Sequence, residues 1–371
     1  MTMNSRIRRW IAAAISVALI GGSIGAPSNA APAPEHLLLV GGTGSGNLAV
    51  LGESAGRLSR IGAPMPIETG TLAVAVTPNG RTAYVAHTVS GTLQGYRIER
   101  SGRLQRIDGA RLAPGQPVVG AVTSPDGRWL FVTVGSITNE IRTYRIADSG
   151  ALSHVDSVPI PGAISGLSIP TVSPDGRFLF APSFIGATMQ AFAIGSDGRL
   201  RRVGKQLPTG ERPALPSVTP DGRFLYITNE GTNDVSGYRI GADGALTSIG
   251  RFATGMIPHG MAITPDGKFL YLPQTGSMSV AGFRIAADGK LVPMASAAIP
   301  SRLGHLPGRV VLSPDAKRLY VIDTLTISGT ARVFSLDVQG DGGLRPSDAP
   351  EVDTGVFFSD GATGVFATPV A

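Results

Sequence analysis

One short phrase recurs along this chain and limits what the chain can fold into. The phrase reads Ser or Thr, then Pro, then Asp or Asn, then Gly or Ala; it occurs six times, and a shorter copy follows near the end. Successive copies lie 45 to 49 residues apart. A fixed period in the forties is typical of stacked or circular arrays in which no unit buries its apolar face alone. The turn residues of the copies are Asn79, Asp126, Asp175, Asp221, Asp266, Asp315 and Asp360.

Each repeat contains four short apolar runs separated by turn residues. The runs are four to nine residues long, partly β-branched or aromatic, and bounded by Gly, Pro or Asp, which is typical of strands. Pro-Asp-Gly presets one φ angle, offers an Asx-type hydrogen bond and tolerates positive φ, so it predicts a tight hairpin. In the fifth repeat the runs are 260–264, 269–272, 277–285 and 291–294.

Four strands and two tight turns per unit describe one antiparallel blade. Seven units therefore predict an all-β fold, a seven-bladed β-propeller with four-stranded blades around a central channel. A row of separate domains is excluded, because a unit of about 47 residues is too small to be stable alone. An open solenoid is less favoured, since its rungs are usually shorter and parallel.

The two ends of the chain predict how the ring closes. Residues 36–40 begin the chain in mid-repeat and match a second strand, whereas residues 355–359 match a first strand. We therefore expect the C-terminal segment to complete the N-terminal blade. Residues 364–369 also resemble a second strand, so two segments compete for one place, and the pattern leaves that choice open.

The N-terminal 30 residues have the three parts of a secretory signal peptide. Arg6, Arg8 and Arg9 precede an apolar stretch over 11–20, and Ser28-Asn-Ala30 matches a small-x-small cleavage site. The sequence thus predicts a signal peptide over 1–30, one propeller domain over 31–371, and a location outside the cytoplasm. The apolar stretch is short for a membrane span, so we expect no stable membrane insertion after cleavage. An uncleaved anchor is the alternative.

Charge and composition limit the classes of ligand and partner that the chain can bind. Without its first 30 residues the chain has 29 basic and 26 acidic residues and no basic run, which argues against nucleic acid. The chain has no cysteine, so thiolate chemistry is excluded. Single acids at isolated turns do not supply the six to eight oxygens of a calcium site. We therefore expect no metal site. We also expect no cofactor, and a monomer that binds a small-molecule ligand or a cell-envelope protein.

One motif match has a structural explanation. Gly52-Glu-Ser54-Ala-Gly56 has the spacing of an esterase nucleophile elbow, but that elbow requires a strand-to-helix turn. Here the segment leads through a hairpin into Leu58, so Ser54 is interpreted as a turn residue.

Blade topology gives a more direct route to a site. The Pro-Asp-Gly turns all lie on one face, and the longer, more varied connections share the other face, where function usually resides. Residues just before a first strand, or just after a second strand, surround the channel mouth on that face. The first set is Glu68, Gln116, Arg212, His259, His305 and Arg309, and the second is His87, Asn229, Glu230, Gln274 and Asp323.

From these residues the sequence predicts a pocket with acid–base groups. His259 and Glu230 are the candidate catalytic pair, with a neutral His259 as the base beside a carboxylate. Arg212, His305, Arg309, His87 and Asp323 are the candidate ligand-binding residues, and Arg212, His305 and Arg309 are expected in the same pocket. The alternative is a set of solvated polar residues at a wet channel mouth.

The repeats also resemble a known family. The run Thr219-Pro-Asp-Gly-Arg-Phe-Leu-Tyr-Ile-Thr-Asn229, followed by Val235–Ile240, is similar to the lactonase-like, YVTN-repeat seven-bladed propellers. That group includes 6-phosphogluconolactonase-type enzymes and fungal carboxymuconate cyclases. The resemblance implies functional roles for Pro258-His259 and Asn229-Glu230, whereas residues 213–215 are Pro-Ala-Leu where the family pattern has Pro-Arg-His.

Two functions follow from these observations. The missing Arg-His pair and the predicted export argue against a sugar-phosphate substrate and favour a binding protein that recognises a small molecule or an envelope partner at the channel mouth. The alternative is a lactone hydrolase or cycloisomerase, which the family resemblance and the His259 and Glu230 matches favour.

Overall fold

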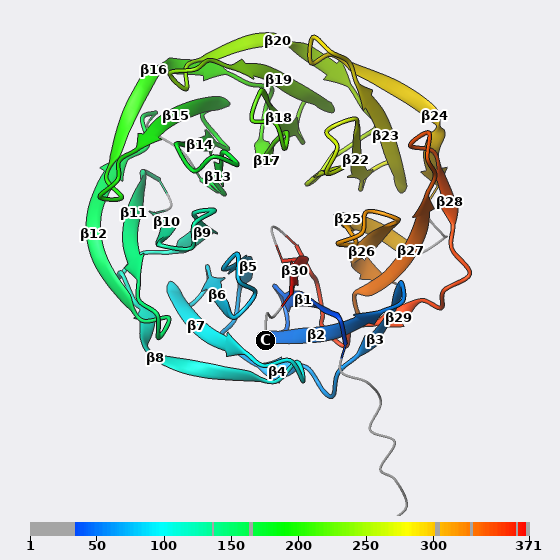
Figure 1. Cartoon of the computed structure of the whole chain (residues 1–371), viewed down its shortest axis with the longest axis horizontal. Helices are drawn as coiled ribbons and strands as arrows, with labels where there is room; N and C mark the ends of the chain where they lie inside the picture. The colour runs from blue at the N-terminus through cyan, green and yellow to red at the C-terminus, as the bar shows by residue number, and fades with distance from the viewer. Residues whose placement is uncertain are drawn as a thin grey trace, which may run out of the picture. The chain divides into compact units, whose positions relative to one another are not determined.

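A computed structural model of the chain describes residues 34–135, 137–162, 166–300, 305–326, 329–360 and 363–368. The predicted signal peptide lies outside these residues. The described residues form seven antiparallel sheets, and each sheet is one blade of a ring around a central axis (Figure 1). The fold is therefore the expected seven-bladed, all-β propeller. The described part of the chain contains no apolar helix of membrane-spanning length.

We number the blades along the chain and label their strands a to d from the axis outward (Figure 1). Blade 1 consists of β30 (Val365–Ala367), β1 (His36–Gly42), β2 (Asn47–Ser54) and an outer strand in two pieces, β3 (Arg57–Arg60) and β4 (Met65–Pro66). Blade 2 is β5 (Thr71–Val76), β6 (Thr82–His87), β7 (Thr92–Ile98) and β8 (Leu104–Leu112). Blade 3 is β9 (Val118–Thr123), β10 (Trp129–Gly135), β11 (Asn139–Ile146) and β12 (Leu152–Pro159).

The remaining blades follow the same order. Blade 4 is β13 (Thr171–Val172), β14 (Phe178–Ser183), β15 (Thr188–Ile194) and β16 (Leu200–Pro208). Blade 5 is β17 (Pro213–Val218), β18 (Phe224–Asn229), β19 (Asp234–Ile240) and β20 (Leu246–Ala253). Blade 6 is β21 (Ala262–Ile263), β22 (Phe269–Gln274), β23 (Ser279–Ile285) and β24 (Leu291–Pro300). Blade 7 is β25 (His305–Leu312), β26 (Arg318–Thr326), β27 (Arg332–Val338), β28 (Leu344–Pro346) and β29 (Val352–Asp353).

The recurring phrase makes the a–b turn of blades 2 to 7 through side-chain hydrogen bonds. In blade 3 the Ser124 hydroxyl donates to Asp126 Oδ1 at 2.5 Å and accepts from the Trp129 amide at 3.0 Å. The Gly127 amide donates to the Ser124 carbonyl at 2.9 Å. A hydroxyl, a carboxylate and a glycine at these positions therefore satisfy the turn locally, which explains why the phrase recurs.

The second recurring turn joins neighbouring blades. Gly342 has a φ of +83°, and a Cβ there would lie 2.4 Å from the ring of Phe269 in the preceding blade. The carbonyl of Gly342 accepts a hydrogen bond from the Tyr271 hydroxyl at 2.8 Å. Only glycine meets both demands without strain, because L side chains rarely adopt this φ and no space remains for a methyl group.

The core is divided among the seven blade interfaces. Each of seven buried apolar clusters draws its residues from two adjacent blades. In β1, Leu37 and Leu39 pack toward blade 2, whereas Leu38 and Val40 pack toward blade 7. Both faces of an inner strand are thus buried, which explains the continuous apolar runs in the sequence.

The C-terminal segment completes the N-terminal blade, as expected, but the strands are assigned differently. β30 pairs antiparallel with β1, so Leu37 is opposite Ala367 and Leu39 is opposite Val365. Residues 364–369, which resembled a second strand, thus supply the first strand, and β1 is the second.

The assignment of 355–359 as a first strand is wrong. These residues form no strand, because their backbone bonds to the β1–β2 turn instead. The carbonyl of Phe358 accepts from the Thr43 amide at 2.6 Å, and that of Phe357 accepts from the Gly44 amide at 3.2 Å. Asp360 is therefore not in an a–b turn. It precedes β30 and lies on the opposite face, among the residues that precede first strands.

Candidate active site

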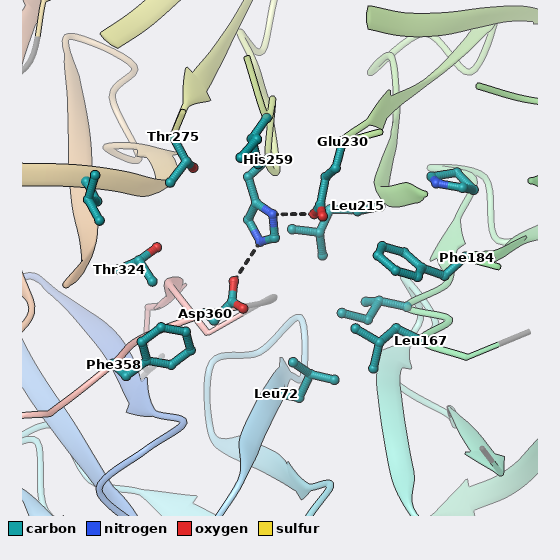
Figure 2. A pocket seen from close by; sticks show the side chains of 15 residues that line it. Leu72, Leu167, Phe184, Leu215, Glu230, His259, Thr275, Thr324, Phe358 and Asp360 are labelled. Atoms are coloured by element: carbon teal, nitrogen blue, oxygen red, sulfur yellow. Dashed lines mark hydrogen bonds and ion pairs between the residues drawn. The ribbon is translucent and has the colours of Figure 1, made fainter. Parts of the chain in front are cut away.

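A cavity of about 300 Å³ opens on the face that carries the b–c and d–a connections. Figure 2 shows side chains from several blades converging on it. Leu72, Pro213, Ala214, Leu215, Leu306 and Thr324 come from the strands, and the remaining residues come from the connections. The latter are Leu167, Ile169, Phe184, Glu230, Ile257, His259, Thr275, Phe358 and Asp360.

His259 and Glu230 meet in this cavity. His259 Nδ1 lies 2.7 Å from Glu230 Oε1, and the two side chains are 13% and 17% exposed. The Glu230 amide donates to the Arg212 carbonyl at 3.1 Å, and the His259 amide donates to the Pro273 carbonyl at 3.1 Å. These backbone bonds fix each residue beside an inner strand of blade 5 or blade 6, so the repeat itself brings the pair together.

Asp360 is the third charged residue of the site, and sequence reasoning missed it. His259 Nε2 lies 3.0 Å from Asp360 Oδ1, so the imidazole is placed between two carboxylates (Figure 2). The Asp360 amide donates to the Thr43 hydroxyl at 3.2 Å, which holds the residue against blade 1. The sequence signal was Thr368-Pro369, a copy of Thr77-Pro78, which marks 365–367 as a first strand and 360 as a residue preceding it.

The two carboxylates decide the charge of His259. Burial by itself would lower the His259 pKa, but the hydrogen bonds and charges of Asp360 and Glu230 outweigh burial and raise that pKa to about 9. His259 is therefore an imidazolium at neutral pH. The expectation of a neutral His259 base is wrong, because the second carboxylate was not foreseen. An imidazolium donates from both ring nitrogens and stabilises negative charge.

The rest of the cavity wall is mainly apolar, and part of it is strained. Leu215, Ile257 and Phe358 have φ angles of +50°, +52° and +52°. Bulky L residues rarely adopt this left-handed region, and such strain persists where the surrounding structure fixes it, often at binding sites. The conformation places three apolar side chains on the cavity wall.

Two predicted ligand-binding residues pair with each other in blade 7. His305 Nδ1 makes a very short contact with Asp323 Oδ2, and His305 Nε2 lies 3.9 Å from Glu351. Burial raises the Asp323 pKa to about 6. Neither residue lines the cavity. His305 turns toward the neighbouring strands β26 and β27 because the buried Asp323 carboxylate attracts it.

The other three predicted ligand-binding residues also lie off the cavity wall. Arg212 is exposed to solvent. His87 is fully buried, with Nδ1 3.4 Å from the Thr71 hydroxyl, and burial lowers its pKa to about 4. Arg309 lies along β25, where its guanidinium packs against Gly260. The expectation that Arg212, His305 and Arg309 line one pocket with His259 is therefore not met, because a position in the repeat does not fix side-chain direction.

One group of possible metal ligands lies outside the cavity. Donor atoms of Glu35, His36 and Glu53 fall within 4.8 Å of one another. Two of the three side chains already have protein partners: His36 Nδ1 lies 2.9 Å from the Thr368 hydroxyl, and Glu53 Oε1 accepts from the Gly56 amide at 2.7 Å. We assign no metal to this group.

Comparison with solved structures shows the same fold at low sequence identity. The periplasmic gluconolactonase PpgL of Pseudomonas aeruginosa has 21% identity and a TM-score of 0.75 over 90% of this chain and 99% of that one. Hydrazine synthase of Kuenenia stuttgartiensis has 20% identity and a TM-score of 0.62 over 81% of this chain and 95% of that one. Proteins of different function thus share this architecture.

Comparison with similar sequences shows the family to which the chain belongs. A 6-phosphogluconolactonase of Pectobacterium carotovorum is 33% identical over 121 residues, which cover 32% of this chain and 34% of that protein. A 6-phosphogluconolactonase of Cronobacter sakazakii is 38% identical over 108 residues, which cover 28% of this chain and 30% of that protein. The chain thus aligns with about a third of the length of each relative. The family described as lactonase, 7-bladed beta-propeller, matches residues 62–215 and 209–303, so the chain belongs to the lactonase family of seven-bladed β-propellers.

Proposed function

We propose that this protein is a hydrolase that opens lactone rings in the cavity around His259. The observation that carries the proposal is the arrangement of one imidazolium between two carboxylates, Glu230 and Asp360, facing a cavity with mainly apolar walls. Acid and base groups side by side in a partly desolvated site are what acyl transfer to water requires. The family match, and the relatives that are 6-phosphogluconolactonases, support the same reaction class.

In the proposed reaction Asp360 is the base and His259 is the cation. Asp360 is the more exposed carboxylate, 34% against 17% for Glu230, so a water reaches it more easily. Asp360 takes a proton from that water while the water oxygen forms a bond to the lactone carbonyl carbon. The His259 imidazolium stabilises the negative charge that develops on the carbonyl oxygen. When the ring C–O bond breaks, the protonated Asp360 returns the proton to the ring oxygen, which becomes the hydroxyl of a hydroxy acid.

Glu230 has a positioning role in this scheme. Its carboxylate accepts the Nδ1–H of His259 at 2.7 Å, which orients the ring and favours its charged form. The product ionises at neutral pH, and its new carboxylate is repelled by Glu230 and Asp360. That repulsion favours product release.

Hydrolysis of a panel of lactones, followed with a pH indicator, tests the proposal. We expect turnover by the purified protein, and a fall in kcat/KM of roughly 10²- to 10⁴-fold in His259→Gln and Asp360→Asn. Asp175→Asn is the matched control, because this carboxylate lies in an a–b turn on the opposite face. No turnover of any lactone would rule the proposal out.

A binding protein without chemistry is the second candidate. Pro213, Ala214 and Leu215 line the cavity where the family pattern has Pro-Arg-His, so two side chains of that pattern are missing from the site. A lactone that raises the melting temperature without being hydrolysed would favour this function.

We also propose that the protein acts outside the cytoplasm. The signal-like segment over 1–30 supports export, and a periplasmic gluconolactonase has the same fold. Fractionation of cells, followed by N-terminal sequencing, is the test. A mature terminus near Ala31 in the exported fraction is expected, and an intact Met1 in the cytosolic fraction would contradict export.

A further inference from the structure

The charged groups of the cavity disfavour an anionic ligand. None of the 15 described residues that line it is Lys or Arg. Among these described residues the cation is His259, which already contacts the two carboxylates of Glu230 and Asp360. Phosphate groups are bound by Arg, Lys or clustered amide donors. A phosphorylated substrate would therefore bring two further negative charges to a wall whose described charged residues sum to about one negative, and the Arg309 guanidinium, which packs against Gly260, is not part of that wall.

The walls of the cavity favour an apolar ligand. Leu72, Leu167 and Phe184 form one side, and Leu215 and Phe358 contribute apolar surface around the charged group (Figure 2). Ile257 also lines the cavity. A sugar lactone carries several hydroxyl groups, and each would lose its water on entering without gaining a partner from these side chains. A hydrocarbon group loses nothing of this kind and gains from burial.

The surface around the mouth of the cavity also carries exposed apolar side chains. Of the ten large apolar side chains that are exposed among the described residues, nine lie in b–c or d–a connections, on the face where the cavity opens. Val292 in β24 is the tenth. A concentration of exposed apolar side chains on one face of a soluble fold marks a binding site for an apolar partner or ligand. The nine are Val89, Ile137, Leu167, Ile185, Met256, Ile257, Met278, Phe357 and Phe358.

Leu167, Ile257 and Phe358 belong both to the exposed group and to the cavity wall. These three side chains therefore connect the exposed apolar surface with the cavity that holds the charged residues. A volume of about 300 Å³ holds a lactone ring with a short chain, and a longer chain would extend toward the mouth along these side chains.

We propose that the cavity takes a neutral lactone that carries an alkyl or other apolar substituent, and that it discriminates against phosphorylated sugar lactones. This inference rests on the proposed hydrolysis for its chemistry. The lactone carbonyl lies at His259 and Asp360, and the substituent lies against Leu167, Ile257 and Phe358. The reaction consumes one water, breaks the ring C–O bond and yields an apolar hydroxy acid.

Three δ-lactones of the same ring size test the substrate class. δ-Decalactone is neutral and apolar, glucono-δ-lactone is neutral and polar, and 6-phosphoglucono-δ-lactone is anionic. We expect kcat/KM for δ-decalactone to exceed that for the phosphorylated lactone by at least about 100-fold, after correction for spontaneous hydrolysis. If kcat/KM is highest for the phosphorylated lactone, the inferred substrate class is wrong and the lactonase proposal stands.

Binding measurements separate the two proposals if no lactone is hydrolysed. Calorimetric titration with δ-decalactone that gives saturable binding, lost in Leu167→Asn, would support the apolar ligand class and overturn hydrolysis. If no lactone is hydrolysed and δ-decalactone does not bind either, both the hydrolysis proposal and the apolar ligand class are overturned. The apolar substrate class is also overturned if kcat/KM is higher for glucono-δ-lactone than for δ-decalactone.

Two substitutions test the walls directly. Leu167→Asn is expected to raise KM for δ-decalactone about tenfold or more; its matched control is Val292→Asn, since the two side chains are 37% and 38% exposed. Ala214→Arg adds a cation to the cavity wall and is expected to raise kcat/KM for the phosphorylated lactone and lower it for δ-decalactone. Ala242→Arg adds the same charge to an exposed turn on the other face as the control. Equal effects of Leu167→Asn and Val292→Asn would contradict the proposed wall.

Discussion

His259 Nε2 lies 3.0 Å from Asp360 Oδ1, although the two residues precede the first strands of different blades, 6 and 1, and are separated by 101 residues of sequence. The contact forms only because β30 closes blade 1 and places the segment before it at the channel mouth. Ring closure and the charge of the candidate active site are thus linked by one short segment.

Asp360→Asn is expected to lower the pKa of His259. The Asp360 carboxylate is one of two groups that hold this pKa at about 9 against the effect of burial, so its removal leaves burial opposed by Glu230 alone. A shift of one unit or more in the titration of the His259 ring, followed by NMR, is the expected result. His154, whose side chain is exposed in blade 3, is the internal reference. An unchanged His259 titration would contradict the assigned contact.

The stability of the fold is expected to depend on pH through His259. Its pKa rises from 6.5 when unfolded to about 9 when folded, so its contribution is complete below pH 6.5 and is lost as pH rises through 9. The rise corresponds to on the order of 3 kcal/mol, because one pKa unit is 1.36 kcal/mol. We expect the difference in unfolding free energy between the wild type and His259→Gln to shrink between pH 6 and pH 9.5. The same substitution at His154 is the control, and a difference independent of pH would sink this prediction.

Ring closure is expected to control global stability. Deletion of residues 364–371 removes β30, which leaves one edge of β1 unpaired and exposes Leu37 and Leu39. The expected result is a fall of several kcal/mol in unfolding free energy, measured by denaturant titration. Thr368→Val removes only the hydroxyl that contacts His36 and should cost about 0.5–1.5 kcal/mol. A deletion variant as stable as the intact chain would refute the closure.

Arg309→Met is expected to stabilise the protein. Arg309 Nε is buried without a hydrogen-bond partner among the described residues, and burial lowers the Arg309 pKa to about 10. Burying a guanidinium without a carboxylate is costly, and an apolar side chain of similar length removes that cost. We expect the unfolding free energy to rise by about 1–3 kcal/mol in Arg309→Met and not to rise in Arg309→Lys. A loss of stability in Arg309→Met would mean that the guanidinium gains more from its surroundings than burial costs it.

Much of the fold could be predicted because the decisive interactions are local. The hydroxyl of Ser124, the carboxylate of Asp126 and the amide of Gly127 lie within four residues and make the turn by themselves. The same two kinds of bond form at the other five full copies, although not at the shorter copy with Asp360, so the period predicted the number of blades. The exception was the closing blade, where residues 355–359 and 364–368 are both apolar. Pairing with β1, hundreds of residues away, decided between them.

The repeat alone predicts the seven-bladed ring and the contact of His259 with Glu230, because both depend on equivalent positions in adjacent repeats. Three features follow only from the folded chain: Asp360 contacts His259, the two carboxylates raise the pKa of His259, and His305, Arg309 and His87 are absent from the cavity wall. These features depend on side-chain direction and on contacts between distant segments. The physical reason is that a repeat fixes where each backbone segment lies, whereas burial and neighbouring charges fix what each side chain does there.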